Sequence, residues 1–548
     1  MEAIYREICA ELGLEPSVVE QPSRNTAVEV AEFHGDSGSV WAPISATRIW
    51  GCRTCLGSSL LLLEQHYADF DRPGLVTEEA ISLILRMLDG HGIPVAVTNI
   101  YGPQCWSVCF PVPDCEDCRD APRELSDLTR TFHALSSRSS ESDEADTRGR
   151  RSVLAADFVA ANRAAIGFAA IVSNPYDGGD EPHATLLEGL IRTSTNPTDC
   201  EVAGGKGLTT GQALASFLGE GLERYFAADP FPARVTLGLE RDLADAIDPI
   251  VEFGYPACDS TLGIDAYKPD LLTEWVAGEN LMSRKEVLVP ANLVFCPYLP
   301  RSSDACRFTV TSTTGVAAGA NLDDATLQAL LELIERDAFW YYARTGQRLA
   351  ALAVEDLHPY VADALSGLPG RMLLHALPNP FNVAVVHATY VTDEQSATRT
   401  ARGIGAGNDI REASMRAFIE CLQILHSLDL AIEVEAVEDD MRRLWFTGEA
   451  VDVLPNFFQD SADSRPPAKM CQEATLPSLI DALSREGIDV YRVVLANSPS
   501  FAVIRVVATG MCITDATYFA SSNRLSEFAR SLPSAPAPRI AYAGPTFM

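Results

Sequence analysis

Three stretches of the chain repeat one pattern of apolar and polar positions. Each begins with a glycine turn and continues into a strongly apolar run that is interrupted by an acidic residue at a constant offset. The three stretches run from Gly207 to Glu220, from Gly319 to Glu332 and from Gly407 to Glu420. The pattern predicts a buried helix in each stretch, with its glutamate two turns into the packed face.

The start of each predicted helix carries the residues of an N-terminal cap. Thr209, Asn321 and Asp409 occupy the cap position, where a side-chain oxygen accepts a backbone hydrogen bond. Three residues later comes a side chain that can reach back to the cap. These side chains are Gln212, Asp324 and Glu412. The copies lie about a hundred residues apart, which indicates duplicated α/β units around a shared site and not a solenoid.

Each helix carries a second polar side chain three residues after its first glutamate. The pairs are Glu220 with Glu223, Glu332 with Glu335, and Glu420 with Gln423. Spacing of three places both members on one helix face, where like charges repel. Buried acids need partners, and magnesium, which binds carboxylate and phosphate oxygens, is one such partner. Ordinary ion pairs between packed helices are the alternative, but three matched copies favour a magnesium site.

Other side chains near these acids suit a phosphate group. Arg224 and Arg336 directly follow the second glutamate, and the guanidinium fork fits phosphate. Ser216 lies one turn before the glutamate of the first helix. Lys206 lies in a glycine-rich turn before the same helix, an arrangement that suits phosphate. The chain contains no GxxxxGK[ST] motif, so the expected nucleotide site is not a P-loop.

Composition narrows the class of protein. The 548 residues are enough for several domains, and the net charge of -33 argues against a nucleic-acid or anionic-membrane surface. The longest apolar runs, such as Leu60–Leu63 and Ala164–Val172, are too short to span a bilayer. The first residues lack the apolar core of a signal peptide. We therefore expect a cytoplasmic protein, in which the 14 cysteines do not form a disulfide framework.

Two CxxC pairs mark the N-terminal region. Cys52 and Cys55 form the first pair, and Cys115 and Cys118 form the second. Four thiolates in this pattern suit a structural zinc ion with no open coordination position. The alternative is that they are small buried apolar residues. A polar segment at 135–151, expected to be a disordered linker, separates this region (1–134) from a mixed α/β region (152–548).

The three repeated segments resemble the nucleotide-binding motifs of YcaO-domain proteins. They read GGKGLTTGQALASFLGEGLERY (204–225), TSTTGVAAGANLDDATLQALLELIERDAFW (311–340) and GIGAGNDIREASMRAFIECLQ (403–423), in the order of the family. The resemblance covers about residues 160–540 and implies an α/β (α+β) YcaO-type fold of repeated subdomains around an ATP site. We expect the following residues at the ATP–Mg²⁺ site: Lys206, Ser216, Glu220, Glu223, Arg224, Asp324, Glu332, Glu335, Arg336, Arg416, Glu420 and Gln423.

The resemblance also implies an activity. YcaO proteins use ATP to activate a backbone amide oxygen of a ribosomally made peptide, so that a Cys, Ser or Thr side chain closes a thiazoline or oxazoline ring. We therefore expect an ATP-dependent cyclodehydratase of natural-product (bacteriocin or thiopeptide-like) biosynthesis. A peptide thioamide synthase and a non-catalytic peptide-binding scaffold are the alternatives. The resemblance leaves the catalytic side chains unassigned.

The N-terminal region carries a second resemblance. GCRTCLGSSLLLLEQ and SVCFPVPDCEDC are similar to the zinc-binding segments of ThiF-like proteins that accompany YcaO enzymes. The region is shorter than a whole ThiF-like domain, so we expect a truncated docking domain. The expected partners are a precursor peptide, a separate ThiF-like leader-binding protein and a flavin dehydrogenase, with the chain itself a homodimer.

Overall fold

The computed structural model describes most of the region from residue 152 to residue 511 and short parts of the N-terminal region. The described N-terminal residues are 28–35, 38–45, 54–55, 58, 95–98, 106–108 and 110–119. Within 152–511 the description breaks at 168–169, 178–182, 197–199, 229–233, 254–266, 310–311, 347, 394–397, 434–439 and 461–473. The expected linker at 135–151 and Cys52 lie outside the described residues.

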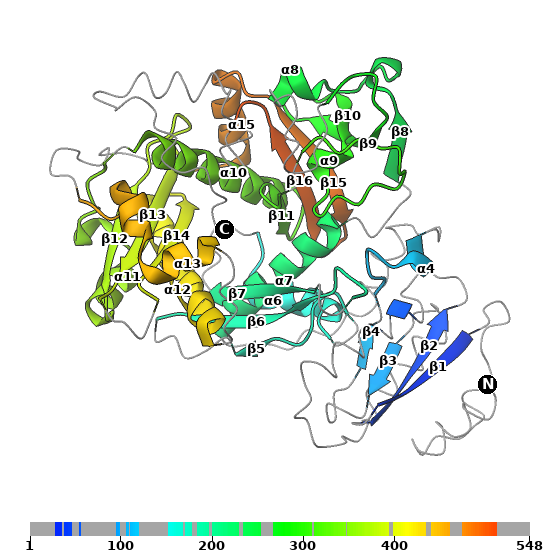
Figure 1. Cartoon of the computed structure of the whole chain (residues 1–548), viewed down its shortest axis with the longest axis horizontal. Coiled ribbons are helices and arrows are strands. Elements are labelled where there is room, and N and C mark those ends of the chain that lie inside the picture. Colours follow the sequence, from blue (N-terminus) through cyan, green and yellow to red (C-terminus); the bar gives the residue numbers. More distant parts are fainter. Residues whose placement is uncertain are drawn as a thin grey trace.

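Each of the three repeated segments forms a strand, a tight turn and a long helix. The first is β7 (Glu201–Gly207) with α7 (Thr210–Ala227), and the second is β11 (Val316–Gly319) with α10 (Leu322–Thr345). The third is β14 (Thr400–Gly407) with α12 (Ile410–Glu433). Figure 1 shows these three helices around the centre of the view. The predicted repeat is therefore confirmed as a structural unit.

The predicted N-caps are confirmed. Thr209, Asn321 and Asp409 each accept a hydrogen bond from the amide three residues later. The second half of the cap differs from the expectation. Gln212 and Glu412 reach the amide of the residue before the cap, at 3.0 and 2.9 Å. The shorter Asp324 side chain instead accepts bonds from the amide and the hydroxyl of Ser152.

Small residues let each helix lie directly on its own strand. A Cβ added at Gly205 would lie 2.3 Å from a carbonyl oxygen of α7, and one added at Gly403 would lie 2.2 Å from a backbone nitrogen of α12. At Gly319 the same atom would lie 2.4 Å from a backbone nitrogen of α10. A side chain at these positions would separate helix from strand, so glycine sets the close approach that positions the acidic helix faces.

The strands of the large region form three antiparallel sheets. Two have three strands, in the orders β5-β6-β7 and β12-β13-β14, and the third has the order β10-β9-β15-β16-β11 with β8 paired to β9. The strands not yet named are β5 (Tyr176–Asp177), β6 (Thr185–Ile191), β8 (Val235–Gly238), β9 (Thr273–Asn280), β10 (Glu286–Pro290), β12 (Arg371–Ala376), β13 (Ala384–Val391), β15 (Val490–Asn497) and β16 (Ala502–Ala508). Helices that pack on antiparallel sheets confirm the α/β (α+β) prediction.

Shorter helices complete the large region. They are α6 (Ala155–Ala161), α8 (Pro249–Phe253), α9 (Ala291–Val294), α11 (Pro359–Ala364), α13 (Asp440–Thr447), α14 (Ala450–Val453) and α15 (Leu476–Arg485). One apolar core packs α7 against the large sheet, a second lies between α10, α15 and that sheet, and a third lies between α12 and the β12-β13-β14 sheet. The helix of each repeated unit thus has its apolar face buried in a core, and its acidic face points away from that core.

The described N-terminal strands form a separate sheet. It has the order β1-β2-β3-β4, built from β1 (Val28–Gly35), β2 (Gly38–Ser45), β3 (Val95–Thr98) and β4 (Trp106–Val108). The short helix α4 (Glu116–Arg119) follows and lies next to the large region in Figure 1. Among the described helices of the whole chain, none combines the length and the apolar character that a bilayer crossing requires.

Candidate functional site

The acidic helix faces reach from one repeated unit to the next. Glu223 on α7 accepts a hydrogen bond from the Ala318 amide of β11 at 2.8 Å. In the same way, Glu335 on α10 accepts one from the Ala406 amide of β14 at 2.9 Å. Ala318 and Ala406 both directly precede the glycine turn of their units. Two interfaces of the repeat are therefore built by the same carboxylate-to-amide contact.

The third interface, between the third and first units, has a different contact. It completes a ring of three helix–strand interfaces. Lys206 of β7 occupies the position of the two alanines, and its ammonium group lies 2.7 Å from the Glu420 carboxylate on α12. Gln423, the counterpart of the two bonded glutamates, lies beside Gly204, where an added Cβ would be 2.2 Å from its amide nitrogen. Strand and helix of the first and third units therefore meet through a half-buried lysine–glutamate pair.

The first glutamate of α7 is held by its own unit. The Glu220 carboxylate accepts a bond from the Gly204 amide at 3.0 Å and lies 2.9 Å from Arg224, one turn further along the helix. Arg224 also lies 2.6 Å from Glu201 at the start of β7. Both acids help to hold the Arg224 guanidinium charged, and its pKa is raised although burial opposes the charged form.

The first glutamate of α10 is held in the corresponding way. Glu332 accepts a bond from the Gly315 amide at 2.9 Å and lies 3.6 Å from Arg336. The Nε and Nη1 atoms of Arg336 are buried and have no hydrogen-bond partner among the described residues. Unpaired buried guanidinium nitrogens are costly, and phosphate oxygens are well suited to satisfy them. Arg336 is therefore the clearest candidate for a phosphate contact.

Burial and mutual repulsion disfavour charge on the acids of α10. Burial raises the pKa of Glu335 to about 7, and Glu420 and Glu332 add to the rise while Arg336 opposes it. Burial also raises the pKa of Glu332. Burial would raise the pKa of Glu420 as well, but Lys206 and Arg336 outweigh it and hold that pKa below its ordinary value. A further cation near Glu332 and Glu335 would stabilise their ionised forms.

Three predicted site residues lie outside this set of contacts. Ser216 is half-buried on α7, one turn before Glu220. Asp324 lies in the first turn of α10, about two turns before Glu332. Arg416 forms its ion pair with Glu412 at 3.0 Å, one turn towards the start of α12. The structure thus brings nine of the twelve predicted residues into the ring, namely Lys206, Glu220, Glu223, Arg224, Glu332, Glu335, Arg336, Glu420 and Gln423.

Two buried arginines near the ring were not predicted. Arg402 on β14 is 4% exposed, and its guanidinium carbon lies 4.6 Å from the centre of the Phe339 ring. Arg505 on β16 is 5% exposed and donates a bond to the Ser312 carbonyl at 2.6 Å. Arg402 adds to the effect of Lys206 and Arg336 in lowering the pKa of Glu420, and Arg505 opposes the rise that burial gives to the pKa of Glu332. The available sequence indication was a single charged residue within an apolar strand run.

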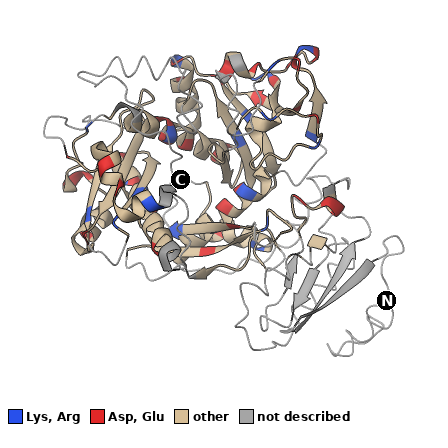
Figure 2. Cartoon of the chain, viewed as in Figure 1, with Lys and Arg blue, Asp and Glu red and all other residues tan. Residues whose placement is uncertain are grey.

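The ring residues can be reached from solvent. Side-chain exposure is 28% for Glu332, 30% for Lys206 and 32% for Arg224. Figure 2 shows acidic and basic positions side by side on α7 and on α10. The ring therefore offers carboxylates for a divalent cation and cationic donors for phosphate in one place.

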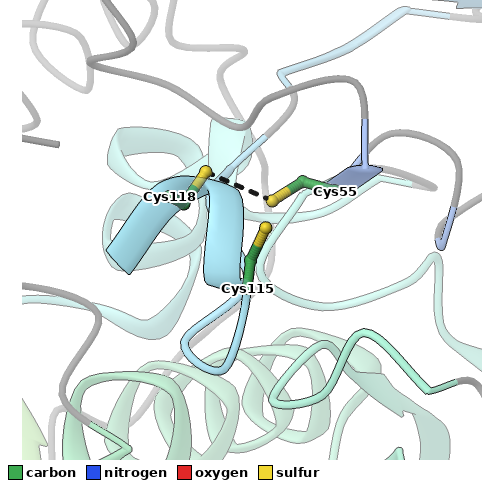
Figure 3. Close-up of side chains that lie close together, drawn as sticks. All are labelled: Cys55, Cys115 and Cys118. Carbon is green, nitrogen blue, oxygen red and sulfur yellow. Dashed lines mark hydrogen bonds between the residues drawn. The ribbon is translucent and has the colours of Figure 1, made fainter. Parts of the chain in front are cut away.

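Three of the four predicted zinc ligands converge in the N-terminal region. The Sγ atoms of Cys55, Cys115 and Cys118 all lie within 4.8 Å of one another, and all three residues are buried. Figure 3 shows the three thiols pointing toward one another, with Cys55 and Cys118 3.6 Å apart. The Val112 amide donates to the Cys55 sulfur at 3.3 Å. This donor set fits a thiolate-bound metal such as zinc.

Comparison with known proteins identifies the family. A family model described as YcaO cyclodehydratase, ATP- and Mg²⁺-binding, matches residues 204–512, which is more than half of the chain. The chain therefore belongs to the YcaO family. A protein of Methanothermobacter thermautotrophicus described as uncharacterised is 28% identical over 346 residues, which is 59% of this chain and 84% of the relative.

Solved structures show the same fold. A heterocyclase in complex with substrate and cofactor has a TM-score of 0.68 at 18% identity, over 94% of this chain and 78% of its own. The heterocyclase TruD has a TM-score of 0.55 at 15% identity, over 94% and 73%. YcaO from Methanopyrus kandleri, bound with AMPPCP and Mg²⁺, has a TM-score of 0.51 at 22% identity, over 72% and 98%.

Proposed function

We propose that this chain is an ATP- and magnesium-dependent cyclodehydratase that forms thiazoline or oxazoline rings in a ribosomally made precursor peptide. The observation that carries the proposal is the closed ring of helix carboxylates around Arg336, whose buried Nε and Nη1 atoms have no hydrogen-bond partner in the described part of the chain. The family description, ATP- and Mg²⁺-binding, supports it. So does the nucleotide and magnesium in the solved YcaO structure of similar fold.

The residues of the ring divide between metal and phosphate. Glu220, Glu223, Glu332 and Glu335 would hold magnesium, which neutralises phosphate charge when it is bound. Arg336 would donate to phosphate oxygens through its two open nitrogens. The hydrogen bonds from backbone amides to Glu223 and Glu335 orient these carboxylates before any ligand binds, so less ordering is needed on binding. Asp324, Ser216 and Arg416 remain proposed nucleotide contacts.

The proposed reaction conserves atoms with ATP as the only co-reactant. The sulfur or oxygen of a Cys, Ser or Thr side chain loses its proton and bonds to the preceding carbonyl carbon, and the C=O π bond opens to place the electron pair on the carbonyl oxygen. The former carbonyl oxygen then takes the terminal phosphoryl group of ATP, and ADP leaves. The carbon–oxygen bond breaks, phosphate departs, and the amide nitrogen loses its proton as the carbon–nitrogen double bond forms. Each ring thus removes the atoms of one water from the peptide.

Peptide mass distinguishes the candidate functions. The chain is mixed with a Cys/Ser/Thr-rich precursor peptide, its partner protein, ATP and magnesium. Loss of one water per ring supports the cyclodehydratase, and replacement of oxygen by sulfur supports the alternative thioamide synthase. An unchanged peptide without peptide-stimulated phosphate release would leave only the scaffold reading.

We also propose a structural zinc ion at Cys55, Cys115 and Cys118, with Cys52 as the fourth ligand. The mutual approach and burial of the three described thiols support it. A closed set of four thiolates leaves zinc no open position, so we assign it no step in the reaction. Metal analysis of purified wild-type protein and of Cys115→Ser tests the site, and equal zinc content in both would contradict it.

The proposed partners follow from this role. They are the precursor peptide, a separate ThiF-like protein that binds its leader, and a flavin dehydrogenase that acts on the finished rings. We place the chain in the cytoplasm as a homodimer, with residues 1–134 as a docking domain for the ThiF-like partner. Light scattering of the chain alone, and of the chain mixed with the partner, measures both assemblies. A monomer that forms no complex with the partner would contradict this part of the proposal.

A further inference from the structure

The cysteine segments rest directly on the first nucleotide helix. Tyr225 of α7 is fully buried and immediately follows Arg224 of the ring. Its hydroxyl donates to the Pro111 carbonyl at 2.7 Å. The Phe110 ring meets the Tyr225 ring edge-on, with 6.4 Å between their centres. One stretch of α7 therefore has the ring of helix carboxylates on one side and the segment that leads to Cys115 on the other.

A buried arginine joins the two cysteine segments to the same part of the fold. Arg192, which directly follows β6, is 3% exposed. It donates to the Cys55 carbonyl at 2.6 Å, to the Phe110 carbonyl at 3.4 Å and to the Ala170 carbonyl at 3.2 Å. Asp114 adds a further link, because its carboxylate accepts bonds from Ser194 and Thr195, each at 2.7 Å.

These contacts make the order of the cysteine site and the order of α7 interdependent. The Cys55 segment and the 110–118 segment are far apart in sequence, and the cysteine cluster, Arg192 and the Thr54–Asp117 hydrogen bond hold them together. A metal ion across the thiols would stabilise this arrangement. Without it, the Pro111 carbonyl would be less firmly held as the acceptor for Tyr225.

We propose that Tyr225 and Arg192 are positioning residues through which the metal-filled cysteine site holds α7 in the conformation that binds Mg²⁺–nucleotide. The proposal rests on the nucleotide and zinc sites argued above, and it adds a coupling between them. Zinc occupancy should then raise nucleotide affinity although zinc does not touch the nucleotide. By reciprocity, bound nucleotide should slow the loss of zinc to a chelator.

The chain offers a matched control for Tyr225. Tyr342 on α10 is also buried, and its hydroxyl also donates to a carbonyl at 2.7 Å, that of Asn456. It is a residue of the second nucleotide helix, and the carbonyl that it binds belongs to Asn456, outside the cysteine segments. Changing either tyrosine to phenylalanine removes one comparable hydrogen bond, but only Tyr225→Phe removes a hydrogen bond between a nucleotide helix and the cysteine segments.

The test measures the dissociation constant of Mg²⁺–AMPPCP for wild type, Tyr225→Phe and Tyr342→Phe, each with zinc and after chelation. Circular dichroism confirms that each stripped protein stays folded. We expect chelation to weaken binding at least about fivefold in wild type and in Tyr342→Phe, and added zinc to restore it. In Tyr225→Phe we expect weaker binding with zinc and less than a twofold further loss without it.

The possible results distinguish failure of the coupling from failure of the proposed function or of the proposed zinc site. Equal affinity of wild type with and without zinc, or full zinc sensitivity in Tyr225→Phe, would overturn the coupling alone. Absence of Mg²⁺–AMPPCP binding in zinc-loaded wild type would overturn the proposed function, and absence of zinc would overturn the metal site. If chelation unfolds the protein, the zinc-loaded forms decide: weakened binding in Tyr225→Phe but not in Tyr342→Phe supports the coupling, and equal affinities reject it.

Discussion

Glu335 and Ala406 belong to different units of the repeat, and the carboxylate of the first accepts a hydrogen bond from the amide of the second at 2.9 Å. The same side chain has a pKa raised to about 7, chiefly by burial. One carboxylate thus joins two units and carries a charge that the ring alone does not fully stabilise. This combination is what a bound cation would resolve.

Glu335→Gln separates these two roles. Glutamine keeps an oxygen that can accept the bond from Ala406, so the fold should survive. The negative charge is lost, so we expect Mg²⁺–ATP turnover to fall about 100-fold or more. Gln423 is the native counterpart of this side chain in the third unit. Peptide-stimulated phosphate release and circular dichroism are the measurements.

The exposed Glu355 provides the control for the lost charge. Glu355→Gln should keep wild-type phosphate release and the wild-type spectrum. Wild-type turnover in Glu335→Gln would contradict the assignment of this carboxylate to the site.

Arg505 should set nucleotide affinity through the turn that precedes β11. Its bond to the Ser312 carbonyl holds this turn, in which the Ser312 hydroxyl accepts from the Thr314 amide and the Gly315 amide binds Glu332. We expect Arg505→Met to raise KM for ATP about tenfold, the effect of losing one charged hydrogen bond, with a smaller change in kcat. Arg505→Lys should recover part of the affinity.

Arg492 on the neighbouring strand is the control for a lost buried arginine. It is 14% exposed and pairs with Glu279 at 2.6 Å. Arg492→Met should lower stability and leave KM for ATP near the wild-type value. Equal KM changes in Arg492→Met and Arg505→Met would show that general loosening of the sheet, and not the turn, is responsible.

Gly403 is expected to be the most sensitive glycine of the third unit. A Cβ at this position would lie 2.2 Å from the Cys421 nitrogen and 2.3 Å from the Ala417 carbonyl oxygen, both backbone atoms of α12. Gly403→Ala must therefore move the helix, at a cost of about 2–3 kcal/mol or more. Denaturant unfolding measures this loss. In contrast, Gly219→Ala within α7 meets no atom within 4 Å and should be neutral or stabilising by up to about 1 kcal/mol.

The buried histidines of the third unit should make the fold sensitive to acid. Burial lowers the pKa of His375 to about 4, and His387, its partner across β12 and β13, is lowered in the same direction. Between pH 6.5 and 4 the unfolded chain binds more protons than the folded chain, so the free energy of unfolding decreases as the pH is lowered. For His375 the loss is about 3 kcal/mol across this window. It should vanish above pH 6.5, where both states are neutral.

Comparing unfolding free energies at pH 7.5 and pH 5 in wild type and His375→Gln checks this expectation. The difference between the two pH values should be smaller in the variant, whatever its absolute stability. The same pH dependence in both proteins would assign the acid sensitivity to other groups.

Local features of the sequence were sufficient to predict the three helices and their caps. Glycine turn, cap and apolar face are encoded within about twenty residues, and Thr209, Asn321 and Asp409 all cap as expected. The bonds between units could not be predicted in this way, because the partners of Glu223 and Glu335 lie 95 and 71 residues away. Their closeness depends on how the units pack.

The same reason explains the missed arginines. Arg402 and Arg505 act on the site from strands outside the helix motifs, and a lone charge in a strand does not reveal which carboxylate it faces. The cysteine pattern was more informative, since metal-ligand spacing is local within each pair. It predicted Cys55, Cys115 and Cys118 as a cluster but not their connection to α7 through Tyr225.

Calorimetric titration of zinc-loaded wild type and of Arg336→Met with AMPPCP, with and without magnesium, measures whether the helix ring binds the Mg²⁺–nucleotide. We expect binding by wild type that requires magnesium, and at least about tenfold weaker binding by Arg336→Met, which lacks the guanidinium nitrogens Nε and Nη1. Equal binding by the two proteins, or wild-type binding that is indifferent to magnesium, would contradict the assignment of the helix ring as the Mg²⁺–nucleotide site.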